Sequence, residues 1–204
     1  MPGLYLPRVL SILHVLFFFS GTAALIYQLM WQRMLFTILG IDLISITIVV
    51  SVFMFGLGVG GLLGGYFADK LKNYLLWAYL IIEAAIALFG FCSPTFMGLI
   101  EHLNFFSSHL FTFLSSFLVL SLPTILMGAT FPILVAYVDT FKLNIGNSVG
   151  GLYFSNTLGG AIGALFSGFI LLNFFTINEV VYLAAVINLI IAVTPLIFLK
   201  RSPI

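Results

Sequence analysis

Residues 55–72 read FGLGVGGLLGGYFADKLK, and the spacing of the glycines in this stretch decides the fold class. Gly56, Gly60, Gly64 and Ala68 recur every four residues. Four residues make about one helical turn, so these small side chains form a stripe along a helix, the pattern by which membrane helices bring their backbones close together. The stretch also contains the G-x-G-x-x-G spacing of dinucleotide-binding loops, but it lies in a long apolar run rather than between a strand and a soluble helix. We therefore expect a helix-packing stripe and no cofactor site.

The composition of the whole chain is that of an integral membrane protein. Of the 204 residues, 62% are hydrophobic and only 6% are charged, whereas about a quarter of the residues of a soluble domain are charged. A chain with so few polar groups cannot cover its surface for water, so the lipid bilayer is its expected surroundings. The formal net charge of +1 gives no field that favours nucleic acid as a partner.

Six apolar segments are each long enough to cross a bilayer as a helix, which takes about 20 residues. They cover residues 10–38, 45–68, 74–98, 107–137, 146–173 and 179–199. Short polar breaks separate the segments, and none of them shows the alternation of a barrel strand. The sequence therefore predicts an all-α protein in which residues 1–204 form a single domain of six transmembrane helices.

The basic residues predict the orientation, because cytoplasmic loops carry an excess of lysine and arginine. The basic residues that fall on one side of the predicted membrane are Arg8, Lys70, Lys72, Lys142, Lys200 and Arg201. The opposite side has only Arg33, near the end of the first segment. Both the N-terminus and the C-terminus are therefore expected to be cytoplasmic.

The fifth segment repeats the small-residue stripe of the second, with Gly159 and Gly163 spaced by one helical turn. Because such stripes mark close helix contacts, we expect the second and fifth spans to pack closely, with each other or with a second subunit.

The end of the opening stretch carries a second pattern. Gly65, Asp69 and Lys70 match the G-x-x-x-D-[RK] signature that major facilitator transporters carry in the loop between their second and third helices. The predicted position, in the first cytoplasmic loop, is the same. The match is incomplete, since Lys72 stands where that signature has a glycine.

Polar side chains inside the predicted spans form a candidate site, because burying them in hydrocarbon is costly. These are Glu83, Asn156, Tyr27, Gln28 and Tyr153. Glu83 lies near the middle of the third span, where a carboxyl group is expected to be protonated or paired with Asn156, Tyr27 or Gln28. Two interpretations remain open: a carboxyl that couples to protons or binds a cation, and a neutral acid hydrogen-bonded to the fifth span.

Trp31 and Arg33 lie towards the outer end of the first span. Aromatic and long basic side chains at this depth commonly reach the headgroup region, so we expect both to be interfacial anchors.

Several ordered stretches together resemble one family: FFFSGTAALIYQLMWQRML (17–35), FGLGVGGLLGGYFAD (55–69), PTILMGATFPIL (123–134) and GGLYFSNTLGGAIGALFSGFILL (150–172). They are similar to the membrane region of bacterial spermidine synthase-like proteins, which join major-facilitator-like helices to a cytoplasmic aminopropyltransferase-like domain. Gln28, Trp31, Arg33, Glu83, Tyr153 and Asn156 stand at positions that recur in those proteins. The resemblance implies a half-major-facilitator bundle in the bacterial inner membrane, and a polyamine or another small cation as ligand.

The resemblance does not extend to the synthase chemistry. The sequence ends at KRSPI after the sixth span, so aminopropyl transfer is not expected of it. No catalytic constellation, metal-ligand spacing or cofactor motif is present in the sequence. A complete facilitator has two six-helix halves, so we expect a transporter-like half that acts as a homo-oligomer or with another membrane subunit. The alternative is a non-transporting integral subunit that docks or anchors other components of a membrane complex.

Overall fold

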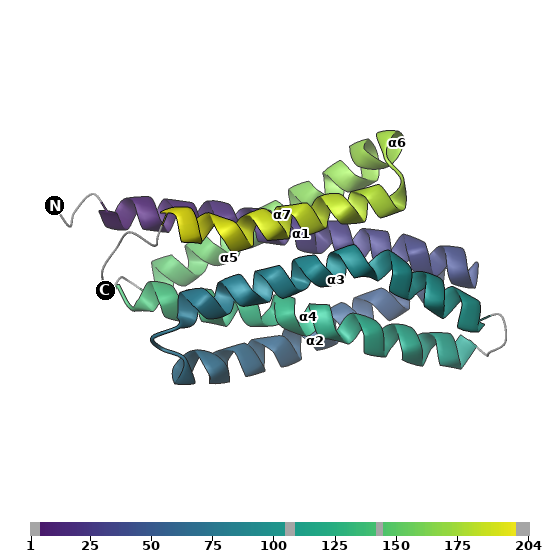
Figure 1. Cartoon of the computed structure of the whole chain (residues 1–204), viewed down its shortest axis with the longest axis horizontal. Helices are drawn as coiled ribbons and strands as arrows, with labels where there is room; N and C mark the ends of the chain where they lie inside the picture. Colours follow the sequence, from purple (N-terminus) through teal and green to yellow (C-terminus); the bar gives the residue numbers. More distant parts are fainter. Residues whose placement is uncertain (1–4, 105–108, 142–144, 199–204) are drawn as a thin grey trace.

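The computed structural model describes residues 5–104, 109–141 and 145–198, which form a bundle of long helices (Figure 1). The helices are α1 (Tyr5–Leu39), α2 (Asp42–Lys70), α3 (Leu75–Asn104), α4 (His109–Asp139), α5 (Ile145–Phe166), α6 (Leu172–Phe174) and α7 (Ile177–Phe198). A π-helical turn, η2 (Ser167–Leu171), joins α5 to α6, so these three elements form one span. Six spans in the described part of the chain are long and apolar enough to cross a membrane, and this part holds no strand. The prediction of an all-α protein with six membrane-spanning helices is confirmed.

The first two spans are joined by a very short turn. Gly40 follows the last residue of α1 and has a φ of 68°, the left-handed conformation that glycine adopts without steric cost. Its N–H donates to the carbonyl oxygen of Phe36 and so satisfies one of the free carbonyl groups at the helix end. This turn ends α1 at Leu39 and sends α2 back along the bundle.

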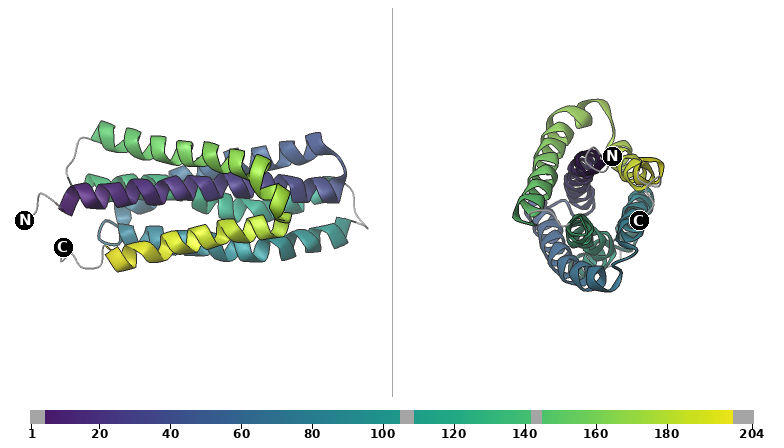
Figure 2. Two further views of the ribbon diagram at one scale, coloured as in Figure 1. Left: turned by 90° about the horizontal axis from the view of Figure 1, so that it is seen from above. Right: turned by 90° about the vertical axis from the view of Figure 1, so that its left-hand side faces the viewer.

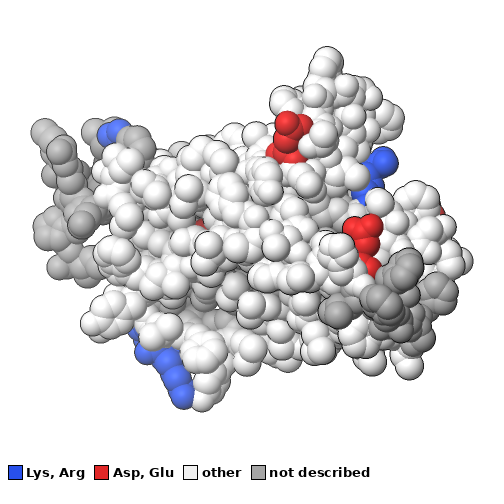
Figure 3. Space-filling view, turned by 45° about the vertical axis from the view of Figure 1, so that its right-hand side comes forward, with Lys and Arg blue, Asp and Glu red and all other residues white. Residues whose placement is uncertain are grey.

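Three of the four described lysine and arginine residues lie at one end of the bundle, and Arg33, near the end of α1, lies towards the other. The start of α1, the turn between α2 and α3, and the end of α7 are at one end of the bundle (Figure 1). Arg8, Lys70 and Lys72 belong to this end and are exposed, whereas Lys142, Lys200 and Arg201 lie outside the described residues. Most of the charged surface on the face in Figure 3 lies towards the two ends, with a broad uncharged band between them. This band suits the hydrocarbon core of a bilayer.

The helix contacts repeat between the two halves of the chain. The main pairs are α1 with α5, α2 with α4, α3 with α7, α3 with α4, and α1 with α7. If the first span is exchanged with the fourth, the second with the fifth and the third with the sixth, the same set of contacting pairs results. The first and fourth spans run in opposite directions, so the two halves form an inverted repeat. Seen from one end, α1 and α4 lie towards the middle of the bundle (Figure 2).

The glycine stripe of α2 lies against α4. A Cβ atom on Gly60 would overlap the carbonyl oxygen of Ile125, and one on Gly64 would lie 2.7 Å from the Cα atom of Ala129. A Cβ atom on Gly56 would overlap the hydroxyl oxygen of Thr124. Only glycine therefore permits this approach of the two backbones.

The glycine stripe of α5 lies against α1, where Cβ atoms on Gly159 and Gly163 would overlap the carbonyl oxygens of Phe18 and Thr22. The expectation that the second and fifth spans pack against each other within one chain is therefore wrong. Each stripe instead packs against the first helix of the other half. The spacing of small residues sets how closely a helix can approach a neighbour, but it does not select the neighbour.

The last span begins with a reciprocal hydrogen-bonded cap. The Thr176 N–H donates to Glu179 Oε2 at 2.8 Å, and the Glu179 N–H donates to Thr176 Oγ1 at 3.4 Å. This is the capping-box arrangement, which satisfies two backbone donors that have no partner inside the helix.

Replacing Thr176 with alanine is expected to lower the free energy of unfolding by about 1 kcal/mol, because the first turn of α7 loses its side-chain acceptor. The measurement is unfolding of the chain in mixed micelles by titration with SDS. Thr47→Ala is the matched control, since the exposed Thr47 hydroxyl only donates to the Leu43 carbonyl within α2. Equal losses in the two variants would contradict the capping role.

Candidate functional site

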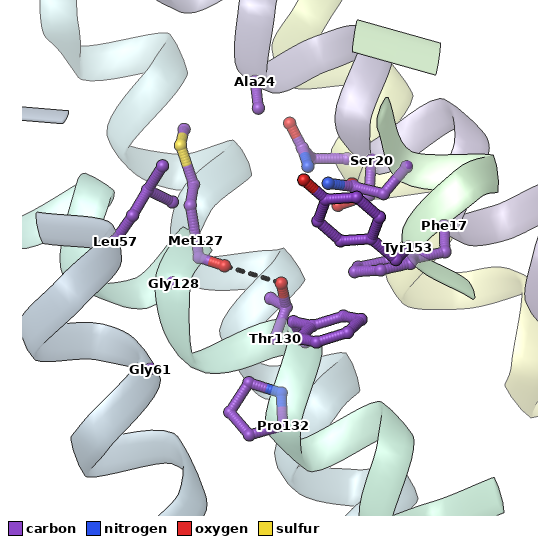
Figure 4. Close-up of a pocket in the computed structure, with 13 residues that line it drawn as sticks. Phe17, Ser20, Ala24, Leu57, Gly61, Met127, Gly128, Thr130, Pro132 and Tyr153 are labelled. Atoms are coloured by element: carbon purple, nitrogen blue, oxygen red, sulfur yellow. Dashed lines mark hydrogen bonds between the residues drawn. The ribbon is translucent and has the colours of Figure 1, made fainter. Parts of the chain in front are cut away.

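A cavity of about 280 Å³ lies where α1, α2, α4, α5 and α7 meet. Figure 4 shows Phe17, Ser20 and Tyr153 on one side of it and Leu57 and Met127 on the other. The lining residues are Phe17, Ser20, Ala24, Leu57, Gly61, Met127, Gly128, Thr130, Phe131, Pro132, Tyr153, Asn156 and Asn188. The wall is thus mostly apolar and aromatic, with a few polar groups, which is the usual composition of a small-molecule site.

Glu83 lies directly behind this wall. Its side chain is fully buried, and both carboxyl oxygens accept hydrogen bonds from residues that line the cavity. Ser20 Oγ of α1 donates to Oε1 at 2.7 Å, and Asn188 Nδ2 of α7 donates to Oε2 at 2.6 Å. The carboxyl group of α3 therefore ties three helices together at the back of the cavity.

These partners differ from the expected ones. Glu83 was expected to pair with Asn156, Tyr27 or Gln28, or to bond to the fifth span, but its hydrogen bonds go to the first and sixth spans. The sequence places polar residues along each helix, and the register between helices decides which of them meet. The predicted partners are therefore wrong, although the residue singled out lies next to the cavity.

The predicted polar residues divide into two groups. Asn156 and Tyr153 of α5 both line the cavity, and the Tyr153 side chain is 63% exposed at its rim. Tyr27 is fully buried, and a Cβ atom on Gly90 of α3 would overlap its hydroxyl oxygen. Neither Tyr27 nor the half-buried Gln28 lines the cavity. The structure therefore joins Asn156, Tyr153 and Glu83 in one region and leaves Tyr27 and Gln28 outside it.

Sequence reasoning missed Ser20 and Asn188, which connect the cavity to Glu83. Asn188 is the one strongly polar residue in the apolar run VVYLAAVINLIIAV (180–193). The cost of burying a polar group, which singled out Glu83, applies equally to this amide. Its amide oxygen Oδ1 is buried and has no hydrogen-bond partner.

Trp31 is not an interfacial anchor. Its side chain is fully buried, its indole N–H donates to Ser93 Oγ at 3.0 Å, and its ring stacks on Tyr27 at 5.0 Å between centroids. Residues four apart share one face of a helix, and here that face is turned into the core. Arg33, two residues further on, is exposed.

The facilitator-like pattern lies at the last turn of α2, which ends at Lys70. Gly65 is half-buried with open space beside its Cα, and Asp69 is exposed. The Lys70 ammonium group lies 4.2 Å from the centroid of the Tyr66 ring and donates to the Tyr66 hydroxyl group. The cation is thus held at the end of the span, where basic side chains meet lipid headgroups.

A second hollow, of about 640 Å³, lies at the end of the bundle opposite the turn between α2 and α3. Its polar side chains are those of Thr37 in α1, Glu101 in α3, Thr176 just before α7 and Asn178 in α7. Over residues 5–104, 109–141 and 145–198, no three His, Cys, Asp or Glu side chains are grouped as metal ligands would be. Neither hollow therefore has the donor set of a metal site.

The chain is similar to a polyamine aminopropyltransferase of Oceanobacillus iheyensis, with 24% identity over 191 residues. The matched region covers 92% of this chain and 36% of that relative. No protein-family model matches the chain. No solved structure matches it either. The chain thus spans about a third of the length of an enzyme that it resembles along nearly its own whole length.

Proposed function

We propose that the chain is a transporter-like half-facilitator of the bacterial inner membrane, with both termini cytoplasmic and the 280 Å³ cavity as its substrate site. The observation that carries this proposal is the position of the cavity. It lies between membrane-spanning helices of both halves of the inverted repeat and has a buried carboxyl group behind its wall. Ionisable residues inside membrane spans typically serve ion or substrate pathways.

The inverted pairing of the spans supports the half-facilitator part of the proposal. Each six-helix half of a major facilitator contains two inverted three-helix repeats, and the substrate path lies between the two halves. The six spans described here have inverted pairing of this kind. In this proposal they form one wall of the substrate path. The chain then acts as a homo-oligomer or beside another membrane subunit.

A polyamine or another small cation is the proposed substrate. The relative is a polyamine aminopropyltransferase, and the match covers 92% of this chain. The acidic group behind the cavity is consistent with a positively charged solute, since opposite charges attract strongly where water is excluded.

Solvent access to the cavity tests the proposal. In a Cys92→Ala background, a cysteine at Asn156 is expected to react with a membrane-impermeant maleimide, and spermidine is expected to slow this reaction. Modification is also expected to abolish spermidine uptake by proteoliposomes. A cysteine at Leu62, 78% exposed and away from the cavity, is the matched control and is expected to react slowly because lipid surrounds it.

The same experiment can reject the proposal. If the cysteine at Asn156 is protected from both sides of the membrane and spermidine uptake equals that of empty vesicles, the transporter assignment fails. That result would favour the non-transporting subunit, in which the polar groups are sealed inside protein.

A further inference from the structure

Three of the side chains that line the cavity use their hydrogen-bond donors inside the protein. Ser20 Oγ and Asn188 Nδ2 both donate to Glu83. Thr130 Oγ1 donates to the Met127 carbonyl oxygen at 2.7 Å, as Figure 4 shows. Hydroxyl and amide oxygens keep lone pairs when their hydrogens are engaged, so this part of the wall offers acceptors.

One of these acceptors is a buried group without a partner. Asn188 is 2% exposed, and its Oδ1 atom has no hydrogen-bond partner in the structure. A buried polar atom that stays unsatisfied destabilises the protein, because it has lost its hydrogen bonds to water without replacing them. A ligand that supplies an N–H or O–H group to this oxygen would remove that destabilisation.

Aromatic rings form the adjoining wall. The rings of Phe17 and Phe131 are stacked at 5.9 Å, and Tyr153 meets Phe131 edge to face at 6.2 Å. The faces of aromatic rings are electron-rich and attract cations that come within about 6 Å of the centroid. Among the residues that the structure describes, those that line the cavity include no lysine, arginine or histidine.

The acid behind the wall has no cationic partner of its own. Within the described part of the chain, the Glu83 carboxyl accepts hydrogen bonds from Ser20 and Asn188, and neither of these side chains carries a charge. Buried acids in membrane spans are usually paired with an opposite charge or a proton. An external cation in the cavity would be separated from this carboxyl group by only one layer of side chains.

We propose that the cavity binds an organic ammonium ion through its N–H groups. The Asn188 amide oxygen accepts one N–H group, the rings of Phe17, Phe131 and Tyr153 surround the charge, and the acidic residue Glu83 lies behind Ser20 and Asn188. An anion is disfavoured, because none of the described side chains that line the cavity carries a positive charge. This inference deepens the proposed function and rests on it, since it takes the cavity to be the substrate site.

Ligand pairs on the unaltered chain give the first test. Isothermal titration of the full chain in detergent is expected to show binding of putrescine. Butane-1,4-diol, with hydroxyl groups in place of the amines, is expected to bind at least tenfold more weakly, because it carries no charge. Tetramethylammonium, a cation without N–H groups, is also expected to bind about tenfold more weakly, since it leaves Asn188 Oδ1 unpaired. The proposal would be overturned if putrescine did not bind, or if putrescine and the diol bound with equal affinity. Equal affinities for putrescine and tetramethylammonium would overturn the role of Asn188.

Variants give the second test. Asn188→Leu is expected to weaken putrescine binding about tenfold, whereas Asn178→Leu, exposed at the start of the same helix, leaves it unchanged. Should Asn188→Leu fail to fold, the exposed Tyr153 gives an independent variant. Tyr153→Leu is expected to weaken binding about threefold and Tyr153→Phe to retain it, because the ring carries the attraction. Equal binding by the Leu and Phe variants would exclude a role for this ring.

The transport experiment tests the transporter function separately from the ammonium site. If putrescine binds as expected but proteoliposomes take up no polyamine, the ammonium site stands and the transporter function fails. If proteoliposomes transport a neutral or anionic solute and putrescine does not bind, the transporter function stands and the ammonium site fails.

Discussion

Replacing Gly60 with alanine is expected to lower the free energy of unfolding by about 3 kcal/mol, because the added methyl group has no space. It would overlap the carbonyl oxygen of Ile125 and lie 2.9 Å from the Cα atom of Gly128. Both obstacles belong to the backbone of α4, so no change of side-chain rotamer can relieve the overlap. The two helices must move apart and lose the close contacts that hold membrane helices together. SDS titration in mixed micelles measures the loss.

Gly58→Ala is the matched control for this prediction. Gly58 lies two residues away on the same helix, but a Cβ atom there meets nothing within 4 Å. Its free energy of unfolding is expected to stay equal to that of the unaltered chain or to rise slightly, because alanine is the better helix former. If the two variants were equally destabilised, the close contact between α2 and α4 would not be the cause.

Replacing Glu83 with alanine is expected to lower the free energy of unfolding by about 3–5 kcal/mol. The truncation leaves a void among buried side chains and removes the acceptor of two hydrogen bonds. Ser20 Oγ and Asn188 Nδ2 would then be buried donors that have lost their acceptor. Glu83→Gln is expected to lose less than the alanine variant. Its amide oxygen can still accept one hydrogen bond, while its amide nitrogen faces the other donor.

Glu101→Ala controls for the loss of an acidic side chain from the same helix. Glu101 is exposed, and a surface substitution of this kind typically changes the free energy of unfolding by less than about 0.5 kcal/mol. Similar losses for Glu83→Ala and Glu101→Ala would show that the hydrogen bonds at the back of the cavity contribute no stability.

The six spans could be predicted from the sequence because hydropathy is a local property. The apolar runs are longer than a bilayer requires and are broken by polar turns, so their number does not depend on how the helices pack. The packing partners of the glycine stripes could not be predicted in the same way. Gly60 and Gly159 show that a close neighbour is needed, but a stripe of small residues fits any smooth helix face.

The candidate site was predictable in part for a related reason. The cost of a buried carboxyl group drew attention to Glu83, and this argument needs only the position of the residue in an apolar run. Its partners Ser20 and Asn188 depend on the rotation and vertical offset of three helices, which no single-sequence pattern specifies. The prediction that Trp31 is an interfacial anchor was wrong for the same reason. The depth of Trp31 along α1 indicated a headgroup contact, but the rotation of α1 about its axis turns this side chain into the core.

The exchange of glycine stripes between the two halves has a consequence for biosynthesis. The closest contacts of α2 are with α4, and those of α1 are with α5. When the ribosome has completed only the first three spans, the stripe on α2 still has lipid or the translocon in place of its partner. The chain must be inserted through α5 before both stripes are covered, so assembly of the bundle is a late event in translation. Until then, the hydrophobicity of each nascent span must hold it in the membrane without the close contacts that both stripes make in the finished bundle.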